Sequence, residues 1–542
     1  MAIELFEQAN KWEGMFMDID GLQARLAAGV ESPRTQRLLR GLLVVLAGFL
    51  LLLFLWAAAR RMRYPFEVEW IESNVLMSVL RVAHGQGLYV APTLDFVPFL
   101  YAPLYLYLAA GLTKIVGVGN HGYMAMRLLS TLATLGSCAA IYFLVLTETR
   151  RRVAGIAAAG MFVGCYAVVG GFYDIGRVDS LFVFLLLLAL LAQRRGHPVV
   201  AALLWVLTFQ TKQTVLPLAV FILCAEWQRP RRLIAGAGTF LAVAGGSILL
   251  LNHATGGWYN FYLFHLSGGF PMVGRLIVLY LPQMVVQPVA VAWVVIVAAV
   301  LLTGVKLRSA GTMFYGFVSV ALYGGTWYVE AHRGASMNAM MPVYAWTAVL
   351  FGVALARLLS WAEKIGSARL GLLALATAAM QLLALVYSPG RFVPPASSVA
   401  ASQRFVEQLR ALPGDVYVLN HSYDAILAGK QPHAEGEALG AVLDAKLGAT
   451  SADLRAELDE AMRAHKYTAV VIDDVEPRDT AWHFERDYPL EESTGLSDLG
   501  YLTSQPNWFL LPCDVKPAVA EGLLRPDSVV ASTGCDGVQE KR

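Results

Sequence analysis

The sequence is poor in charge, because Asp, Glu, Lys and Arg make up 15% of its 542 residues while 57% are hydrophobic. Soluble domains carry about 25% charged residues, so the composition argues against a soluble protein. Many apolar runs reach the length of about 20 residues that crosses a hydrocarbon core about 30 Å thick. The net charge of +2 gives no indication of a nucleic-acid partner. The chain is predicted to be a polytopic α-helical membrane protein.

Several motifs are also missing. The sequence has no GxGxxG, Walker A, HExxH or CxxC motif, which argues against a nucleotide-driven pump. No short apolar segment with a small-residue cleavage site precedes the first long apolar run, so no signal peptide is predicted. Three of the five cysteines lie in apolar spans and are predicted to be inert. Cys513 and Cys535 lie in a polar region, where they either form a disulfide outside the cytoplasm or stay free.

Basic clusters predict the topology, because cytoplasmic loops collect Arg and Lys. These clusters lie at 150–152, 194–195, 229–232 and 306–308. If all are cytoplasmic, the chain has about 11 spans: 41–59, 128–147, 153–172, 180–193, 198–210, 214–227, 233–252, 276–303, 312–329, 338–357 and 369–387. Segment 98–117, which is rich in Pro and Tyr, is then a juxtamembrane helix in the outer interface. Arg60, Arg61 and Arg63 follow the first span and conflict with this orientation. An alternative count of 12 spans would place the C-terminal domain in the cytoplasm.

Three regions are predicted: a cytoplasmic amphipathic segment (1–36), a transmembrane domain (37–387) and an extracytoplasmic α/β domain (388–542). The last begins at a linker rich in Pro and Ser, after which helical patterns alternate with the β-rich runs DVYVLN, TAVVIDD and NWFLLP. Four polar residues in this domain fit no standard metal-site spacing and are expected to be solvated. They are His421, His433, Glu435 and Glu437.

The stretch 66–107, just after the first span, is the first outward loop and contains the acids Glu69, Glu72 and Asp95. Glu69 and Glu72 are three residues apart and share one face if the segment is helical. In such a pair, one carboxylate can act as a general base while the other tunes it or holds a metal ion. The alternative is an interfacial acid pair neutralised by a nearby arginine. Tyr101 belongs to an aromatic cluster in the same stretch.

Ionisable residues beside the other spans are candidates for function, because a charge at membrane depth costs roughly 2.5–3.5 kcal/mol. Asp174, Arg177 and Asp179 lie at one outward turn, where Arg177 either pairs with an aspartate or helps to hold a phosphate. Lys212 lies at another turn, where it either extends to the headgroups or binds a phosphate as a point charge.

A further outward loop contains Glu330, His332 and Arg333, with Asn338 just inside the next span. One acid and two potential cations suit a diphosphate or sugar-phosphate site, and the alternative is a salt bridge within the loop. In the predicted topology all of these groups face the same side of the membrane. Independent structural charges would have no reason to gather there, so the sequence favours a single site.

The chain resembles the C-type (GT-C) integral-membrane glycosyltransferases, including bacterial relatives of the aminoarabinose and protein O-mannosyl transferases. The resemblance covers roughly residues 40–387. It is carried by the order and spacing of VEWIES, GQGLY, FVPFLYAPLYLYL, YDIGRVDSLF, TKQT and AHRGASMNAMMPVYA. It implies transfer of a sugar from a polyprenyl-phosphate carrier to a glycan, lipid or protein acceptor, with inversion, on the outer face of a bacterial inner membrane.

The resemblance also implies that a carboxylate in the first outer loop is the base. Where many members have Asp-Glu or Asp-Asp, this chain has Glu-x-x-Glu, which leaves open whether Glu69 or Glu72 is the base. We expect eight residues to bind the substrate or its phosphate: Tyr101, Asp174, Arg177, Asp179, Lys212, His332, Arg333 and Asn338. No cofactor is required by the pattern, although a divalent cation is compatible with it. A transporter or flippase, or a scaffold for lipid-linked saccharides, is the alternative function.

Overall fold

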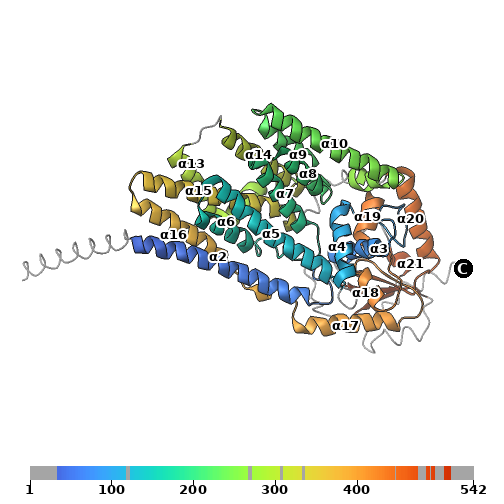
Figure 1. The fold of residues 1–542 in the computed structure, drawn as a ribbon. Helices are drawn as coiled ribbons and strands as arrows, with labels where there is room; N and C mark the ends of the chain where they lie inside the picture. The colour runs from blue at the N-terminus through green and yellow to red at the C-terminus, as the bar shows by residue number, and fades with distance from the viewer. Residues whose placement is uncertain are drawn as a thin grey trace, which may run out of the picture.

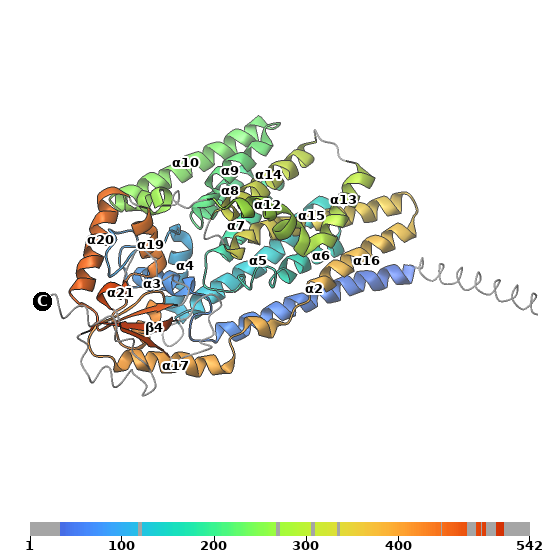
Figure 2. The same ribbon diagram turned by 180° about the vertical axis from the view of Figure 1, so that it is seen from behind.

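The computed structural model describes residues 33–116, 122–266, 272–304, 309–332, 336–445, 447–473, 484–488, 490–494 and 506–513. A long helical bundle makes up most of the protein, and a small sheet with its helices covers one end of it (Figures 1 and 2). The predicted amphipathic segment before residue 33, Arg333 and Cys535 lie outside the described residues. Cys513 is disulfide-bonded.

The bundle contains a helix at each of the 11 predicted spans. Its α-helices are α2 (Pro33–Met62), α5 (Met124–Thr149), α6 (Arg152–Gly164), α7 (Asp179–Arg194), α8 (Pro198–Phe209), α9 (Leu216–Leu223), α10 (Pro230–Ala254), α12 (Gly274–Leu279), α13 (Ala290–Thr303), α14 (Ala310–Glu330), α15 (Met341–Lys364) and α16 (Ala368–Ala384). Five helices in the described part are long and apolar enough to cross a membrane, or six if one bent pair counts as a span. The protein is therefore a multi-pass membrane protein, and the count of 11 crossings stays a prediction.

The outer surface of the bundle is apolar, as expected for helices in lipid. Leu52 of α2, Leu249 of α10 and Leu301 of α13 are 65%, 73% and 75% exposed. Two helices differ from the predicted spans. The first is α6, which ends at Gly164 instead of continuing to 172, and the turns that follow it include Gly170 and Gly171 with positive φ angles of 66° and 78°.

The second difference is in the segment 274–303, which is not one continuous α-helix. A π-helical stretch, η5 (Tyr280–Val286), and a short 3₁₀ turn, η6 (Gln287–Val289), separate α12 from α13. Pro282 and Pro288 lie in these two stretches. Each proline lacks the N–H that continues an α-helical ladder, so the hydrogen-bond pattern changes there.

The first loop lies between the bundle and the sheet and contains α3 (Ile71–Ala83) and α4 (Pro103–Val116) (Figure 1). Helix α4 coincides with the predicted helix at 98–117, and its place in the membrane interface stays a prediction. Every residue from Ile71 to Leu80 of α3 is buried. This helix is therefore packed on all sides, which fixes the orientation of Glu72 in its first turn.

The sheet has the strand order β1-β2-β4-β3. Its strands are β1 (Val416–Val418), β2 (Ala469–Asp473), β3 (Leu490–Ser493) and β4 (Pro506–Leu511), of which β1 and β2 are parallel and the other pairings antiparallel. The accompanying helices are α17 (Ala396–Ala411), α18 (Ser422–Leu427), α19 (Gly436–Asp444), α20 (Gly448–Arg463) and α21 (Phe484–Asp487). Strands β1, β2 and β4 lie where the three β-rich runs predicted them. We call residues 396–513 the sheet domain.

Candidate active site

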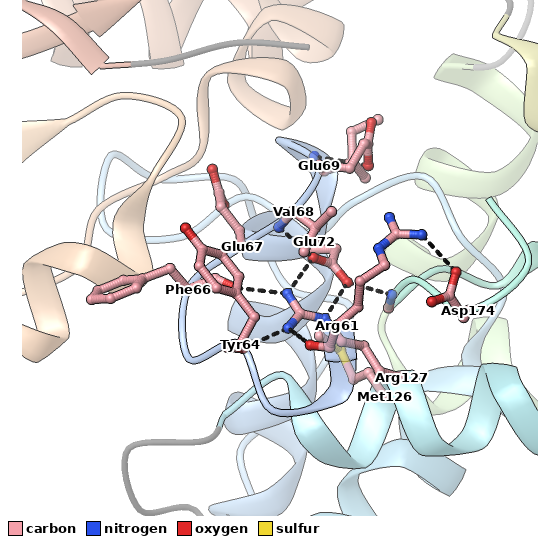
Figure 3. Close-up of polar contacts among 12 residues, drawn as sticks. Arg61, Tyr64, Phe66, Glu67, Val68, Glu69, Glu72, Met126, Arg127 and Asp174 are labelled. Carbon is pink, nitrogen blue, oxygen red and sulfur yellow. Dashed lines mark hydrogen bonds and ion pairs between the residues drawn. The ribbon is translucent and has the colours of Figure 1, made fainter. Parts of the chain in front are cut away.

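Glu72 is held by a fully buried arginine. The Nε of Arg127 donates to Glu72 Oε1 at 3.0 Å and its Nη2 donates to Oε2 at 2.7 Å. The backbone N–H groups of Gly176 and Val68 donate to the same two oxygens at 2.6 and 2.8 Å. Figure 3 shows these contacts converging on one carboxylate. Both oxygens of Glu72 are therefore occupied by donors.

This environment keeps Glu72 ionised. Burial alone would raise its pKa, but the charge of Arg127 and the hydrogen bonds to its carboxylate hold the pKa below the ordinary glutamate value. Arg127 also donates to the carbonyl oxygens of Arg61, Tyr64 and Phe66 at 2.7–2.8 Å. The Glu72–Arg127 pair thus fixes the backbone between α2 and α3. A carboxylate in this state is a poor proton acceptor.

Glu69 lies in a different environment. Its side chain points away from Arg127 (Figure 3), and Oε1 accepts from Arg177 Nη1 at 2.9 Å. Among the described residues, the other oxygen accepts only a long bond of 3.3 Å, from the Ile71 N–H. Burial raises the pKa of Glu69 above the ordinary value, although the charge of Arg177 opposes this shift. Glu69 is consequently the more basic of the two acids and has one oxygen that is weakly engaged.

Arg177 connects Glu69 to the next groups. Its Nη2 donates to the Tyr101 hydroxyl at 3.0 Å, and its Nε lies 3.5 Å from Asp179 Oδ2. Asp179 in turn accepts from Lys212 Nζ at 2.7 Å, and Asn338 lines the pocket beside these two residues. Residues from the first loop and from two later segments, 177–179 and Lys212, therefore form one continuous polar chain.

This polar chain ends at a small, partly open pocket. The polar part of its wall is formed by Asp179, Lys212, Thr214, Thr326 and Asn338, and the other lining residues come from α7, α9, α14, α15 and the turn just before α15. Those residues are mostly apolar and include Phe182, Val183, Leu218, Leu322, Val329 and Pro342. The pocket thus combines an ion-paired end with an apolar wall, the combination expected for a ligand with one charged group and an apolar part.

Asp174 belongs to a separate ion pair. Arg61, at the end of α2, donates from Nη1 to Asp174 Oδ1 at 2.6 Å, to the Tyr166 hydroxyl at 2.6 Å and to the Gly171 carbonyl at 2.7 Å. All of these groups are buried. Arg61 is therefore a structural partner of the chain that unwinds after α6. This explains one of the basic residues that conflicted with the predicted orientation of α2.

Among the described residues, His332 and Glu330 make no hydrogen bond or ion pair with the polar chain, although Glu330 interacts electrostatically with Lys212. The His332 Nδ1 is hydrogen-bonded to the Tyr328 carbonyl at 2.6 Å, one turn back along the chain. Glu330 is buried, and its Oε1 has no hydrogen-bond partner in the part of the chain that the structure describes. It lies one turn beyond Thr326, which lines the pocket.

The sequence reasoning missed Glu67, which is closer to Glu69 in the chain than Glu72 is. It also missed Arg127, although an arginine at the start of an apolar span is itself a signal. The expectation that His421, His433 and Glu435 are solvated is wrong, since they are 1%, 5% and 4% exposed. These residues are buried because the sheet domain packs tightly against the first loop. No group of three His, Cys, Asp or Glu side chains within the described ranges is arranged to hold a metal ion.

The comparisons with known proteins agree with this architecture. Residues 99–323 match glycosyltransferase family 87. ArnT from Cupriavidus metallidurans in the apo state superposes with a TM-score of 0.55 at 15% identity, covering 87% of this chain and 97% of that one. The fold is that of the GT-C glycosyltransferases.

A second structure of the same relative supports this assignment. ArnT from Cupriavidus metallidurans bound to undecaprenyl phosphate superposes with a TM-score of 0.54 at 15% identity, covering 80% of this chain and 93% of that one. No curated protein matches the chain in sequence. The resemblance predicted from the order of the motifs is therefore confirmed.

Proposed function

We propose that this GT-C protein transfers a sugar from a polyprenyl-phosphate carrier to an acceptor hydroxyl, with inversion at the anomeric carbon and Glu69 as the general base. The observation that carries the proposal is the polar chain Glu69–Arg177–Asp179–Lys212, which reaches from the first loop to the pocket. The match to glycosyltransferase family 87 supports the reaction class. The undecaprenyl phosphate bound by ArnT supports the carrier.

The choice of Glu69 follows from the two environments. A base must accept a proton, and Glu69 has a raised pKa and a weakly engaged oxygen, whereas all donors of the Glu72 site stabilise its ionised form. As the acceptor oxygen attacks the sugar C1, its proton moves to Glu69 and the C1–O bond to the carrier phosphate breaks. Glu72 then acts as a positioning residue that keeps the loop in place through Arg127.

Charge balance favours the same arrangement. The four ion-paired groups Glu69, Arg177, Asp179 and Lys212 carry two negative and two positive charges, so their sum is zero. When Glu69 takes up the proton, the sum becomes +1. This surplus appears while the departing carrier phosphate gains negative charge, which Lys212 and Arg177 can stabilise. One of the three N–H groups of Lys212 donates to Asp179, and the other two can donate to a phosphate.

The pocket suits a carrier that arrives from the membrane. Helices α9 and α14 line it and also expose apolar side chains, with Val220 38% and Val320 64% exposed. A lipid tail can therefore lie along these helices while its phosphate reaches Lys212. We further propose that the protein lies in the bacterial inner membrane with 11 spans, and that the sheet domain and the first loop are extracytoplasmic. The acceptor is then a component of the cell envelope.

Replacement of Lys212 by Met tests the donor site. We expect Lys212→Met to raise the KM for a polyprenyl-phosphate sugar about 10- to 100-fold, because a hydrogen bond to a charged group contributes about 1.5–3 kcal/mol. Lys212→Arg should recover part of the loss. The measurement is release of the sugar from the carrier by the full-length protein in lipid nanodiscs.

The matched control is Lys114→Met, which removes an exposed lysine from the last turn of α4. Its KM should equal that of the wild type. Equal KM values for Lys212→Met and the wild type would remove the pocket from the donor site. Absence of sugar release by the wild type with every polyprenyl-phosphate sugar would contradict the proposed reaction.

A further inference from the structure

The first loop and the sheet domain share one hydrophobic core. Val75 and Val79 of α3 lie in the same buried cluster as Leu439 and Val442 of α19. Just before α5, the ring of Tyr123 packs edge-on against a ring of the sheet domain, Tyr423, with a centroid distance of 5.2 Å. The loop that carries Glu69 is therefore positioned by the sheet domain as well as by the bundle.

A buried histidine links the two parts. His421 of the sheet domain bonds Glu67 of the first loop through Nδ1, and its Nε2 contacts Asp473 Oδ1 of β2 at 3.0 Å. Each of the three side chains is 2% exposed or less. Figure 3 shows Glu67 on the side of its loop opposite to the Arg61–Asp174 pair. Removing the His421 side chain would leave the buried Glu67 without its partner, which is strongly unfavourable.

A second buried contact lies at the other end of the same segment. The hydroxyl of Ser73 donates to Glu435 Oε1 at 2.6 Å and accepts from the Tyr423 N–H at 3.2 Å. Glu67 and Ser73 stand on either side of Glu69 and Glu72 in the sequence. The sheet domain thus holds the segment with both acids at its two ends.

We infer that the sheet domain positions the proposed base, and that His421 is the positioning residue through which it does so by way of Glu67. This inference rests on the proposed function, since Glu69 is the base only in that reaction. His421 itself acts through Glu67 and through the backbone between residues 67 and 69. Its effect is therefore expected on the rate of the chemical step and not on binding of the donor, which depends on Lys212 and the other lining residues of the pocket.

The contact depends on a proton. Burial alone would lower the pKa of His421, but the charges of Asp473 and Glu67 raise it well above the ordinary value, and Asp424 and Glu435 face the same cluster. After separation, the pKa of His421 returns to about 6.5. Protonated His421 therefore stabilises the contact between the sheet domain and the first loop fully below about pH 6.5. This stabilisation is lost as the pH rises through the raised pKa of His421. We expect the turnover rate to fall on the alkaline side for this reason.

The contribution of Glu435 to stability also falls as the pH rises, but over a different pH range, so it can be tested separately. Burial raises the pKa of Glu435 to about 7, so the folded protein binds this proton more tightly than the unfolded chain does. Stability from this group is lost as the pH rises from about 4.3 to 7. We expect Glu435→Gln to reduce the decline of the melting temperature over that range, measured by thermal denaturation in detergent. An unchanged decline would show that Glu435 titrates normally.

The experiment for His421 uses the full-length protein in lipid nanodiscs and compares His421→Gln and Glu67→Gln with Ser451→Ala. The hydroxyl of Ser451 is buried and bonds the Val442 carbonyl and the Leu447 N–H within the sheet domain, so this control weakens the domain without touching the first loop. Amide hydrogen exchange of residues 64–83 is measured together with kcat, KM and the pH profile.

We expect His421→Gln to lower kcat about 10²-fold, as small misplacements of catalytic groups do, while the donor KM stays unchanged. Exchange in residues 64–83 should become faster and the alkaline fall in rate should disappear. Glu67→Gln should reproduce the loss of rate, and Ser451→Ala should change neither kcat nor the exchange. Unchanged exchange in both variants, or an equal loss of kcat in Ser451→Ala, would overturn the inference. A wild type without transferase activity would contradict only the proposed function, because exchange is measured without turnover.

Discussion

Glu69→Gln should lower kcat about 10²- to 10⁴-fold, the usual contribution of a general base. Gln has nearly the same shape and can still accept from Arg177 through its carbonyl oxygen, but it cannot take up a proton. The donor KM should change little, because Lys212 and Asn338 of the pocket are untouched. Because Glu69 must be ionised to act, the rate of the wild type should rise with pH through a pKa above the ordinary glutamate value.

The control for this prediction is Glu69→Asp, which keeps the carboxylate but withdraws it by one methylene. Asp should retain more activity than Gln and should keep the acidic limb of the pH profile, whereas Gln should lose that limb. The melting temperatures of both variants should stay near that of the wild type, because Arg177 keeps Asp179 and Tyr101 as partners. Full activity of Glu69→Gln would exclude Glu69 as the base.

Much of this site could be predicted from the sequence, because charged residues are rare beside membrane spans. Charges beside apolar spans are costly, so Glu69, Arg177, Asp179 and Lys212 stood out without any knowledge of the fold. The basic loops then placed these residues at one end of the bundle, where the structure brings them together in one polar chain. The length of the apolar runs predicted the positions of the helices for the same reason, since spans exposed to lipid must be apolar.

The pairing of each acid could not be predicted in this way. Glu72 finds Arg127 at a separation of 55 residues, and Glu67 finds His421 at a separation of 354. Such contacts depend on how α3, α5 and α18 pack, and the local sequence does not encode that packing. The end of α6 at Gly164 was also missed, because the turns that follow it are stabilised by a distant residue, Arg61, which donates to the Gly171 carbonyl. From their spacing in the sequence, Glu69 and Glu72 are equivalent candidates for the base. Only their hydrogen-bond partners in the structure distinguish them.

Glu72→Gln should instead destabilise the protein by about 3–5 kcal/mol, because it leaves the charge of Arg127 buried without compensation. Its effect should appear as a lower melting temperature and a lower yield of folded protein, measured in detergent beside Glu69→Gln. The pKa of Glu72 is lowered in the folded state, so its contribution is present above about pH 4.3 and is lost as the pH falls further.

A double variant distinguishes this structural role from catalysis. Glu72→Met combined with Arg127→Met removes both charges, so the loss of stability should be smaller than the sum of the two single losses. Some loss should persist, because the carbonyls of Arg61, Tyr64 and Phe66 and the N–H groups of Val68 and Gly176 lose their partners. If Glu72→Gln instead melted like the wild type and lost turnover, while Glu69→Gln stayed active, the two roles would be exchanged. The base would then be the acid that this structure shows to be the more tightly held.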